Sequence, residues 1–219
     1  MGVTSVKTAP AVEPVGLSEI KDHLAISFTE HDSMLQGMLR AARRNLEWTY
    51  ERAMITQTLV LTLDRFDRAA WEGRTFWGVA PQTWALGLSI TWSILEVRSP
   101  VQQINSITYI DTAGVTQTMA TSDYSFAAGS EASVGRVYPI LNKVWPAVAP
   151  IPAAVKVEYV AGYTTPELVP DDWKAAIKLY VGHLYANREQ VIADARAAAI
   201  VLPYGIEELM GRYAPGLLA

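Results

Sequence analysis

The stretch PVGLSEIKDHL, residues 14–24, begins a helical pattern that continues as far as Glu47. A second helical pattern starts at residue 169, continues through residues 184–189 and closes at residues 202–206, near the other end of the chain. Each pattern has an apolar face, and the two ends must come together for either to bury that face. The region between them has the period of β-strands. This layout predicts an α+β fold, with a helical bundle built from both ends and a central antiparallel β insertion.

Two helices are predicted in the N-terminal part, at residues 17–25 and 30–52. Gly16 occupies the N-cap of the first, and Glu19 follows three residues later, as in a capping box that lacks its hydroxyl. Thr29 is the expected cap of the second helix. That helix has one apolar face, and its other face carries the charged residues Arg40, Arg43, Arg44, Glu47 and Glu51.

Alternating residues along Ile55–Leu63, with threonines on one side, predict the first strand of the middle region. The turn at residues 111–114 predicts a hairpin between the strands that flank it. The other predicted strands are Glu96-Val97 and residues 104–110, 115–119, 124–126, 134–138 and 155–160.

Two more helices are predicted at residues 172–188 and 205–213, the first of them begun by Pro170 and Asp171-Asp172. Residues 1–13 show no periodicity and are expected to form a mobile arm. The chain is therefore divided into three parts by sequence alone. These are the arm and first helices (1–53), the β-rich insertion (54–163), and the remaining helices with a tail (164–219).

Composition narrows the class of protein. The chain has 219 residues, of which 50% are hydrophobic and 18% charged, far from the composition of disordered chains. It contains no cysteine, which excludes disulfides and thiolate chemistry. The formal charge of −4 does not favour binding to nucleic-acid phosphates. Residues 75–95 are uncharged but broken by Pro81 and Gly87, so we do not expect a transmembrane segment. The N-terminus lacks a basic region followed by an apolar run, so we do not expect a signal peptide.

No group of residues predicts catalysis or metal binding. The three histidines, His23, His31 and His183, do not have the spacing of metal ligands. Asp64 and Asp67 alternate with arginines, as expected of a solvated turn. No serine has a nucleophile-elbow context, and no glycine-rich stretch opens a helix. We therefore expect a non-enzymatic protein without metal or cofactor.

Two features are candidate protein interfaces. Arg40, Arg43, Arg44 and Arg52 would form a basic stripe, but Glu47 and Glu51 interrupt it. The interruption favours a solvated or subunit-facing helix surface, with Arg40 and Arg44 as candidate contacts. The second feature is a tryptophan-rich segment with Trp71, Trp77, Trp84 and Trp92. Tryptophan is enriched at binding hot spots, yet these side chains would also fill the core of the β region, and both interpretations stay open.

Taken together, these patterns resemble the head–tail connector (adaptor) family of tailed phages and of phage-derived gene transfer agents. The resemblance extends from about Val12 to Tyr213. Gly16 replaces the hydroxyl cap usual in that family, and the segment between Asp67 and Ile94 is longer than the family needs. The resemblance rests on the order and spacing of residues 14–24, Ala41-Ala42-Arg43 with Glu47, Gln57-Thr58-Leu59, Ser99-Pro100-Val101, 107–114, Asp123-Tyr124, Trp145-Pro146, 157–163, Val169-Pro170 and 185–189.

The resemblance implies a structural protein whose copies form a ring, expected to be dodecameric, beneath the portal at the capsid vertex. The implied partners are the portal protein, a tail-side stopper or terminator protein, other copies of the chain, and double-stranded DNA passing through without sequence-specific binding. The implied location is the head–tail interface of the virion, after assembly in the host cytoplasm. Modest acidity agrees with this role, because a strongly basic channel would retard DNA.

The C-terminal segment is the expected portal contact, through Tyr204, Tyr213, Leu217 and Leu218. Deleting residues 203–219 is then expected to abolish portal binding while the remainder stays folded. The ring interface is expected to use helix faces from both ends of the chain. Two alternatives remain, namely a stopper or tail-terminator component of the same particle, and a nucleic-acid-binding module that uses the helix at residues 40–52.

Overall fold

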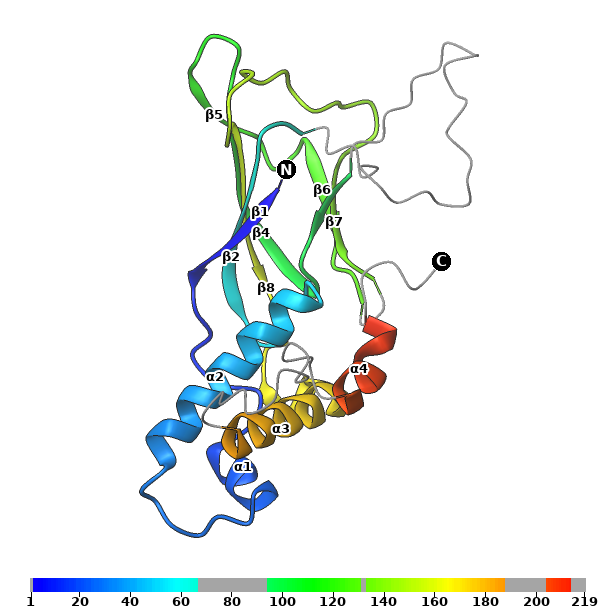
Figure 1. The fold of residues 1–219 in the computed structure, drawn as a ribbon. Coiled ribbons are helices and arrows are strands. Elements are labelled where there is room, and N and C mark those ends of the chain that lie inside the picture. Colours follow the sequence, from blue (N-terminus) through cyan, green and yellow to red (C-terminus); the bar gives the residue numbers. More distant parts are fainter. Residues whose placement is uncertain (1, 67–93, 131–132, 188–203, 214–219) are drawn as a thin grey trace, which may run out of the picture.

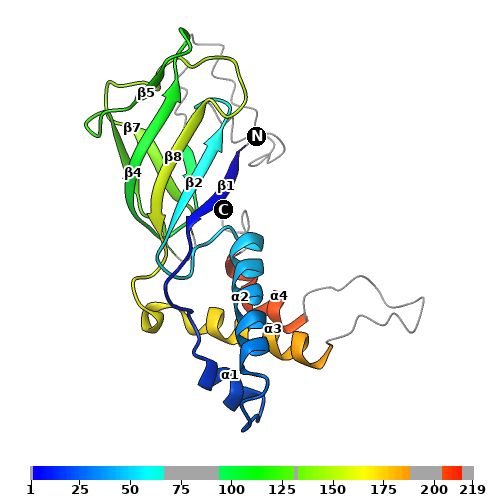
Figure 2. The same ribbon diagram turned by 90° about the vertical axis from the view of Figure 1, so that its left-hand side faces the viewer.

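A computed structural model describes residues 2–66, 94–130, 133–187 and 204–213. In this part of the chain, four α-helices gather at one end of the molecule and two antiparallel sheets form the other end (Figures 1 and 2). The α+β class predicted from the sequence is therefore confirmed.

The helices come from both ends of the chain and share one hydrophobic core. α1 (Leu17–His23) and α2 (Asp32–Thr49) precede most of the strands, whereas α3 (Asp171–Ala186) and α4 (Tyr204–Met210) follow them. A 3-10 turn, Gly211–Tyr213, continues α4. The two ends thus bury their apolar faces together, as the periodicity predicts. Core residues include Ile20, Leu35, Leu39, Leu46, Trp173, Ile177, Val181, Ile206 and Met210.

The larger sheet has five strands in the order β1-β2-β8-β4-β5, and the smaller has three in the order β3-β7-β6. Alternate residues of β2 are buried, so Leu59, Leu61 and Leu63 enter a second core that both sheets share. The strands are β2 (Gln57–Leu63), β3 (Leu95–Val97), β4 (Val101–Ile110), β5 (Thr116–Thr118), β6 (Tyr124–Ala127), β7 (Gly135–Pro139) and β8 (Val155–Ala161).

The N-terminal residues differ from the sequence-based expectation. A mobile arm is predicted over residues 1–13, but Val3–Thr8 form strand β1, which pairs antiparallel with β2. Five of the six β1 residues are exposed, so neither face of the strand needs an apolar pattern. Backbone pairing and an ion pair between Lys7 Nζ and Glu158 Oε2, 2.6 Å long, hold it instead. The sheet is therefore not solely an insertion between the helices.

The start of α2 also differs from the prediction. Thr29 is not its side-chain cap, because His31 occupies the N-cap position and no side chain there accepts a capping hydrogen bond. The Thr29 carbonyl oxygen instead accepts a hydrogen bond from the Asp32 N–H at 3.0 Å. Lys21 Nζ lies 2.8 Å from Asp32 Oδ1 and connects α1 to this turn.

Glu19, in α1, contacts both the residue that precedes this helix and a lysine of α3. Its Oε1 accepts a hydrogen bond from the Gly16 N–H at 3.2 Å, the half of a capping box that needs no hydroxyl. Its Oε2 lies 2.8 Å from Lys178 Nζ. The hydrogen bond from Lys178, followed by that from Gly16, lowers the pKa of Glu19 below its ordinary value of 4.5.

We expect Glu19→Gln to lower the free energy of unfolding by roughly 0.5–1 kcal/mol at pH 7, since the pair is half-exposed and screened by solvent. A lowered pKa in the folded state means that the carboxylate stabilises the fold above its ordinary pKa. That contribution is lost as the pH falls through the lowered value. Urea unfolding of both proteins at pH 7 and pH 3 measures the difference. An equal deficit at both pH values would contradict this prediction.

Candidate functional site

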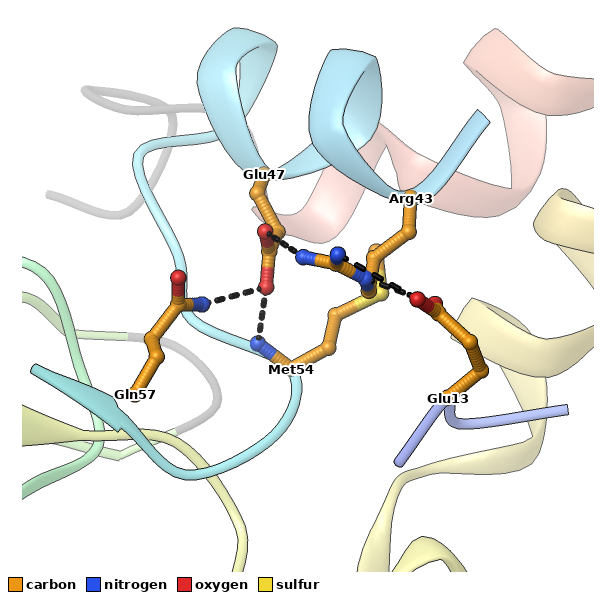
Figure 3. Close-up of polar contacts among 5 residues, drawn as sticks. All are labelled: Glu13, Arg43, Glu47, Met54 and Gln57. Carbon is orange, nitrogen blue, oxygen red and sulfur yellow. Dashed lines mark hydrogen bonds and ion pairs between the residues drawn. The ribbon is translucent and has the colours of Figure 1, made fainter. Parts of the chain in front are cut away.

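The junction between the helices and the sheets contains a buried cluster of charged and polar groups (Figure 3). Arg43 and Glu47, one turn apart on α2, are only 4% and 2% exposed. The sequence-based interpretation places both on the outer, charged face of the helix, and it is wrong. Glu13 and the segment 54–57 contact that side of α2 and cover it.

The cluster joins three parts of the chain. Arg43 Nη1 donates to Glu47 Oε2 at 2.7 Å. Arg43 Nε donates to Glu13 Oε2 at 2.7 Å, and its Nη2 donates to Glu13 Oε1 at 3.3 Å. Glu47 Oε1 accepts from the Met54 N–H at 2.9 Å and from Gln57 Nε2 at 2.7 Å. The segment before α1, the helix α2 and the start of β2 therefore meet at one guanidinium–carboxylate pair.

Burial and charge act against each other in this cluster. Burial raises the pKa of the Glu47 carboxyl, and the Arg43 guanidinium offsets only part of that rise. Burial acts to lower the pKa of Arg43, but hydrogen bonds and attraction from Glu13 and Glu47 produce a net increase. The groups that face Glu47 are all donors, which favours the ionised carboxylate. The hydrogen bonds are therefore satisfied only when α2 and β2 keep this relative orientation.

Arg52 is a further departure from the predicted basic stripe. It follows the end of α2 and is buried, with Nη1 3.5 Å from the Glu51 carbonyl oxygen. Burial lowers the pKa of its guanidinium. Of the four arginines in the predicted stripe, Arg40 and Arg44 alone are exposed, both on the outer side of α2. A continuous basic surface along this helix is therefore not formed.

The other residues predicted to form protein interfaces lie in different environments or outside the described residues. Tyr213 is buried in the helical core, where its ring centroid lies 5.0 Å from that of Trp173 and its hydroxyl donates to Asp172 Oδ2 at 3.1 Å. It is therefore unavailable as the exposed portal contact that the sequence suggests. Tyr204 begins α4. Trp71, Trp77, Trp84, Leu217 and Leu218 lie outside the described residues.

The burial of α4 also changes an expectation about truncation. Ile206 and Met210 are fully enclosed by the other helices, and Tyr213 follows them into the same core. Removing residues 203–219 would delete these side chains and expose their partners, at a cost of several kcal/mol. We therefore expect the truncated chain to be clearly less stable than the full chain, so this deletion does not test portal binding alone.

The structure shows exposed apolar side chains that sequence analysis did not single out. Trp48 is 67% exposed on the outer side of α2, and Arg98 Cζ lies 5.6 Å from its ring centroid. Leu141 and Val144, in the connection between β7 and β8, are 80% and 83% exposed. One signal was available for Trp48, because it follows Arg40 and Arg44 at helical spacing, on the side opposite the apolar positions.

The described residues contain no group of three or more His, Asp or Glu side chains that could hold a metal ion. Two histidines have partners within the helical end. His31 Nδ1 lies 2.8 Å from the Tyr185 hydroxyl, and His183 Nδ1 lies 3.3 Å from Asn187 Nδ2. Among the helices described, none has the length and apolar character needed to cross a membrane.

Comparison with known proteins identifies the fold. No protein-family model matches the sequence, and no curated protein matches it. Solved structures of gene transfer agent (GTA) particles do match. A chain in the neck of an empty GTA particle, computed with C6 symmetry, is 20% identical, with a TM-score of 0.64 over 97% of this chain and 95% of that one. A chain in the virion of a native GTA particle has the same identity, coverage and TM-score.

A third match is a chain in the neck of a native GTA particle computed with C12 symmetry. It is 20% identical, with a TM-score of 0.63 over 96% of this chain and 94% of that one. The protein thus has the fold of chains found in the neck of gene transfer agent particles. The resemblance to proteins of these particles, stated from the sequence, is confirmed at the level of the fold.

Proposed function

We propose that this chain is a structural subunit of the neck of a tailed phage or phage-like particle. In this proposal it is the head–tail connector (adaptor), which forms a ring beneath the portal, extends the DNA channel and docks the tail. The supporting observation is the fold shared over 97% of the chain with a neck chain of a GTA particle. The C12 symmetry used for one of those necks agrees with a ring of twelve copies.

The shape of the molecule supports a ring role. Helices from both ends share one hydrophobic core beside the sheets, and the cluster of Glu13, Arg43, Glu47 and Gln57 connects the two parts. A head-to-tail contact closes into a ring only when each copy adds the same rotation. A junction held by these hydrogen bonds would give every copy the same internal orientation.

Electron microscopy of the chain mixed with its cognate portal tests the proposal. The expected result is a ring of copies attached to the portal, coaxial with its channel. Pull-down with purified portal separates the adaptor from a stopper or tail terminator, which would bind the adaptor ring and leave the portal unbound. Double-stranded DNA is expected to pass through the ring without sequence-specific contacts.

The portal contact is proposed to lie in residues 214–219, through Leu217 and Leu218. We expect deletion of residues 214–219 to weaken portal binding at least about tenfold in pull-down titrations, because two apolar anchors are lost. The melting temperature should stay unchanged, since Ile206 and Met210 remain in the core.

The matched control for this deletion replaces two exposed apolar residues elsewhere. Leu141→Ser combined with Val144→Ser changes the connection between β7 and β8 and should leave portal binding intact. Undiminished binding by the truncated chain would refute the proposed contact.

A further inference from the structure

Three exposed side chains form a line along the outer side of α2. Arg40, Arg44 and Trp48 are four residues apart, so they are neighbours on one face of the helix. Arg98, which follows β3, adds its guanidinium beside the Trp48 ring. We call these four residues the α2 patch. The three arginines give this surface a positive charge, and Glu51, the exposed acidic residue nearest in sequence, lies beyond the end of α2.

The exposure of Trp48 indicates that another protein surface covers it in an assembly. A tryptophan side chain removes some 150–250 Å² from solvent when it is buried, and this one is 67% exposed. Tryptophan and arginine are two of the three residue types most enriched at binding hot spots. The α2 patch combines both types on a rigid helix.

The opposite flank of the helical end carries the opposite charge. α3 contacts both α2 and α4, and in Figure 1 α2 lies toward the left of the helical end and α4 toward its right. Ile206 and Met210 of α4 face the core, whereas Glu207 and Glu208 are exposed. We call Glu207 and Glu208 the α4 patch.

We propose that the α2 patch of one copy docks on the α4 patch of the next copy, so that Arg40 and Arg44 face Glu207 and Glu208 and Trp48 is covered. This inference rests on the ring in the proposed function and names its contact surfaces. Complementary charge on two flanks is the arrangement that a head-to-tail ring needs. A two-fold contact of α2 with α2 would instead oppose arginine to arginine.

Cysteine cross-linking tests the contact directly, because the natural chain contains no cysteine. Arg44→Cys and Glu208→Cys variants, distinguished by tags of different size, are mixed and treated with a short bis-maleimide. The expected result is a mixed dimer in several-fold excess over a control mixture in which Arg136→Cys replaces Arg44→Cys. Arg136 is an exposed arginine on β7. Mixed dimer no greater than in the control, or a majority of Arg44→Cys homodimer, would overturn the proposal.

Charge reversal provides a second measurement. Arg44→Glu and Glu208→Arg should each weaken self-association by about tenfold or more, and the two together should restore most of it. Trp48→Ala should weaken it by about thirtyfold, the effect of a hot-spot residue. Sedimentation over a range of concentrations measures the association, and circular dichroism checks that each variant is folded. Unchanged association of Trp48→Ala would contradict the proposal.

The experimental outcomes distinguish a failure of the proposed contact surfaces from a failure of the proposed ring. If the wild-type chain forms no oligomer alone or on the portal, the proposed ring fails and the contact fails with it. If rings form while cross-linking stays at the control level, only the choice of surfaces is wrong. If Arg44→Glu abolishes salt-dependent retention of DNA and leaves self-association unchanged, the α2 patch binds nucleic acid and the proposal is overturned.

Discussion

Replacing Arg43 by alanine is expected to lower the free energy of unfolding by about 3–5 kcal/mol, the typical cost of removing one partner of a buried ion pair. The substitution would leave Glu47 buried without its cation and Glu13 without its two-pronged partner. For a chain of this length, the melting temperature should fall by roughly 6–20 °C. Chemical denaturation and calorimetry of the purified variant measure both quantities.

The adjacent arginine is the matched control. Arg44→Ala removes the same side chain from an exposed position of the same helix, and should change stability by no more than about 0.5 kcal/mol. Equal losses in the two variants would show that the cluster does not hold the junction. A double-mutant cycle of Arg43→Ala with Glu47→Ala isolates their interaction from the other hydrogen bonds of Glu47.

Substituting Gly162 by alanine is the second change expected to have a large effect, about 2–6 kcal/mol, from an overpacked contact added to a strained backbone. Gly162 has φ +112, and a Cβ there would lie 2.2 Å from the Ile55 carbonyl oxygen. The obstacle is backbone on the segment that leads into β2, so a side-chain rotation cannot relieve it. The Gly162 N–H also donates to the Pro100 carbonyl oxygen at 2.8 Å, which limits any shift of β8.

Gly114 is the control for the conformational part of this effect. It also has a positive φ, +81, but a Cβ at this position meets nothing within 4 Å. Gly114→Ala should therefore cost only the strain of a left-handed residue, about 1–2 kcal/mol. Equal melting temperatures for the two variants would show that the contact with Ile55 carries no cost.

Both predicted losses arise where the helices meet the sheets, and this is where sequence reasoning was weakest. Arg43 and Arg44 are adjacent, equally charged and equally compatible with a solvated helix. Only the approach of Glu13 and Gln57 makes one of them a buried partner. Glu13 and Gln57 lie outside α2 in the sequence, and the periodicity of the helix does not predict that they contact it.

The same reason explains the other differences between prediction and structure. β1 is held by backbone hydrogen bonds, which any sequence can form, so Val3–Thr8 carry no alternating pattern. Tyr213 lies in a short amphipathic segment that the sequence does predict. Whether such a segment turns inward or toward a partner depends on the space that Trp173 and its neighbours leave.

The amino-acid sequence by itself determined the order of helices and strands, the meeting of the two helical ends and the general fold. These follow from periodic burial, which each segment encodes locally. Tertiary structure alone decided which arginine is buried, that the N-terminal residues join the sheet, and that Trp48 stays exposed while Tyr213 is enclosed. Each of these depends on contacts between distant segments. Such contacts form only when the chain folds, so no local sequence pattern encodes them.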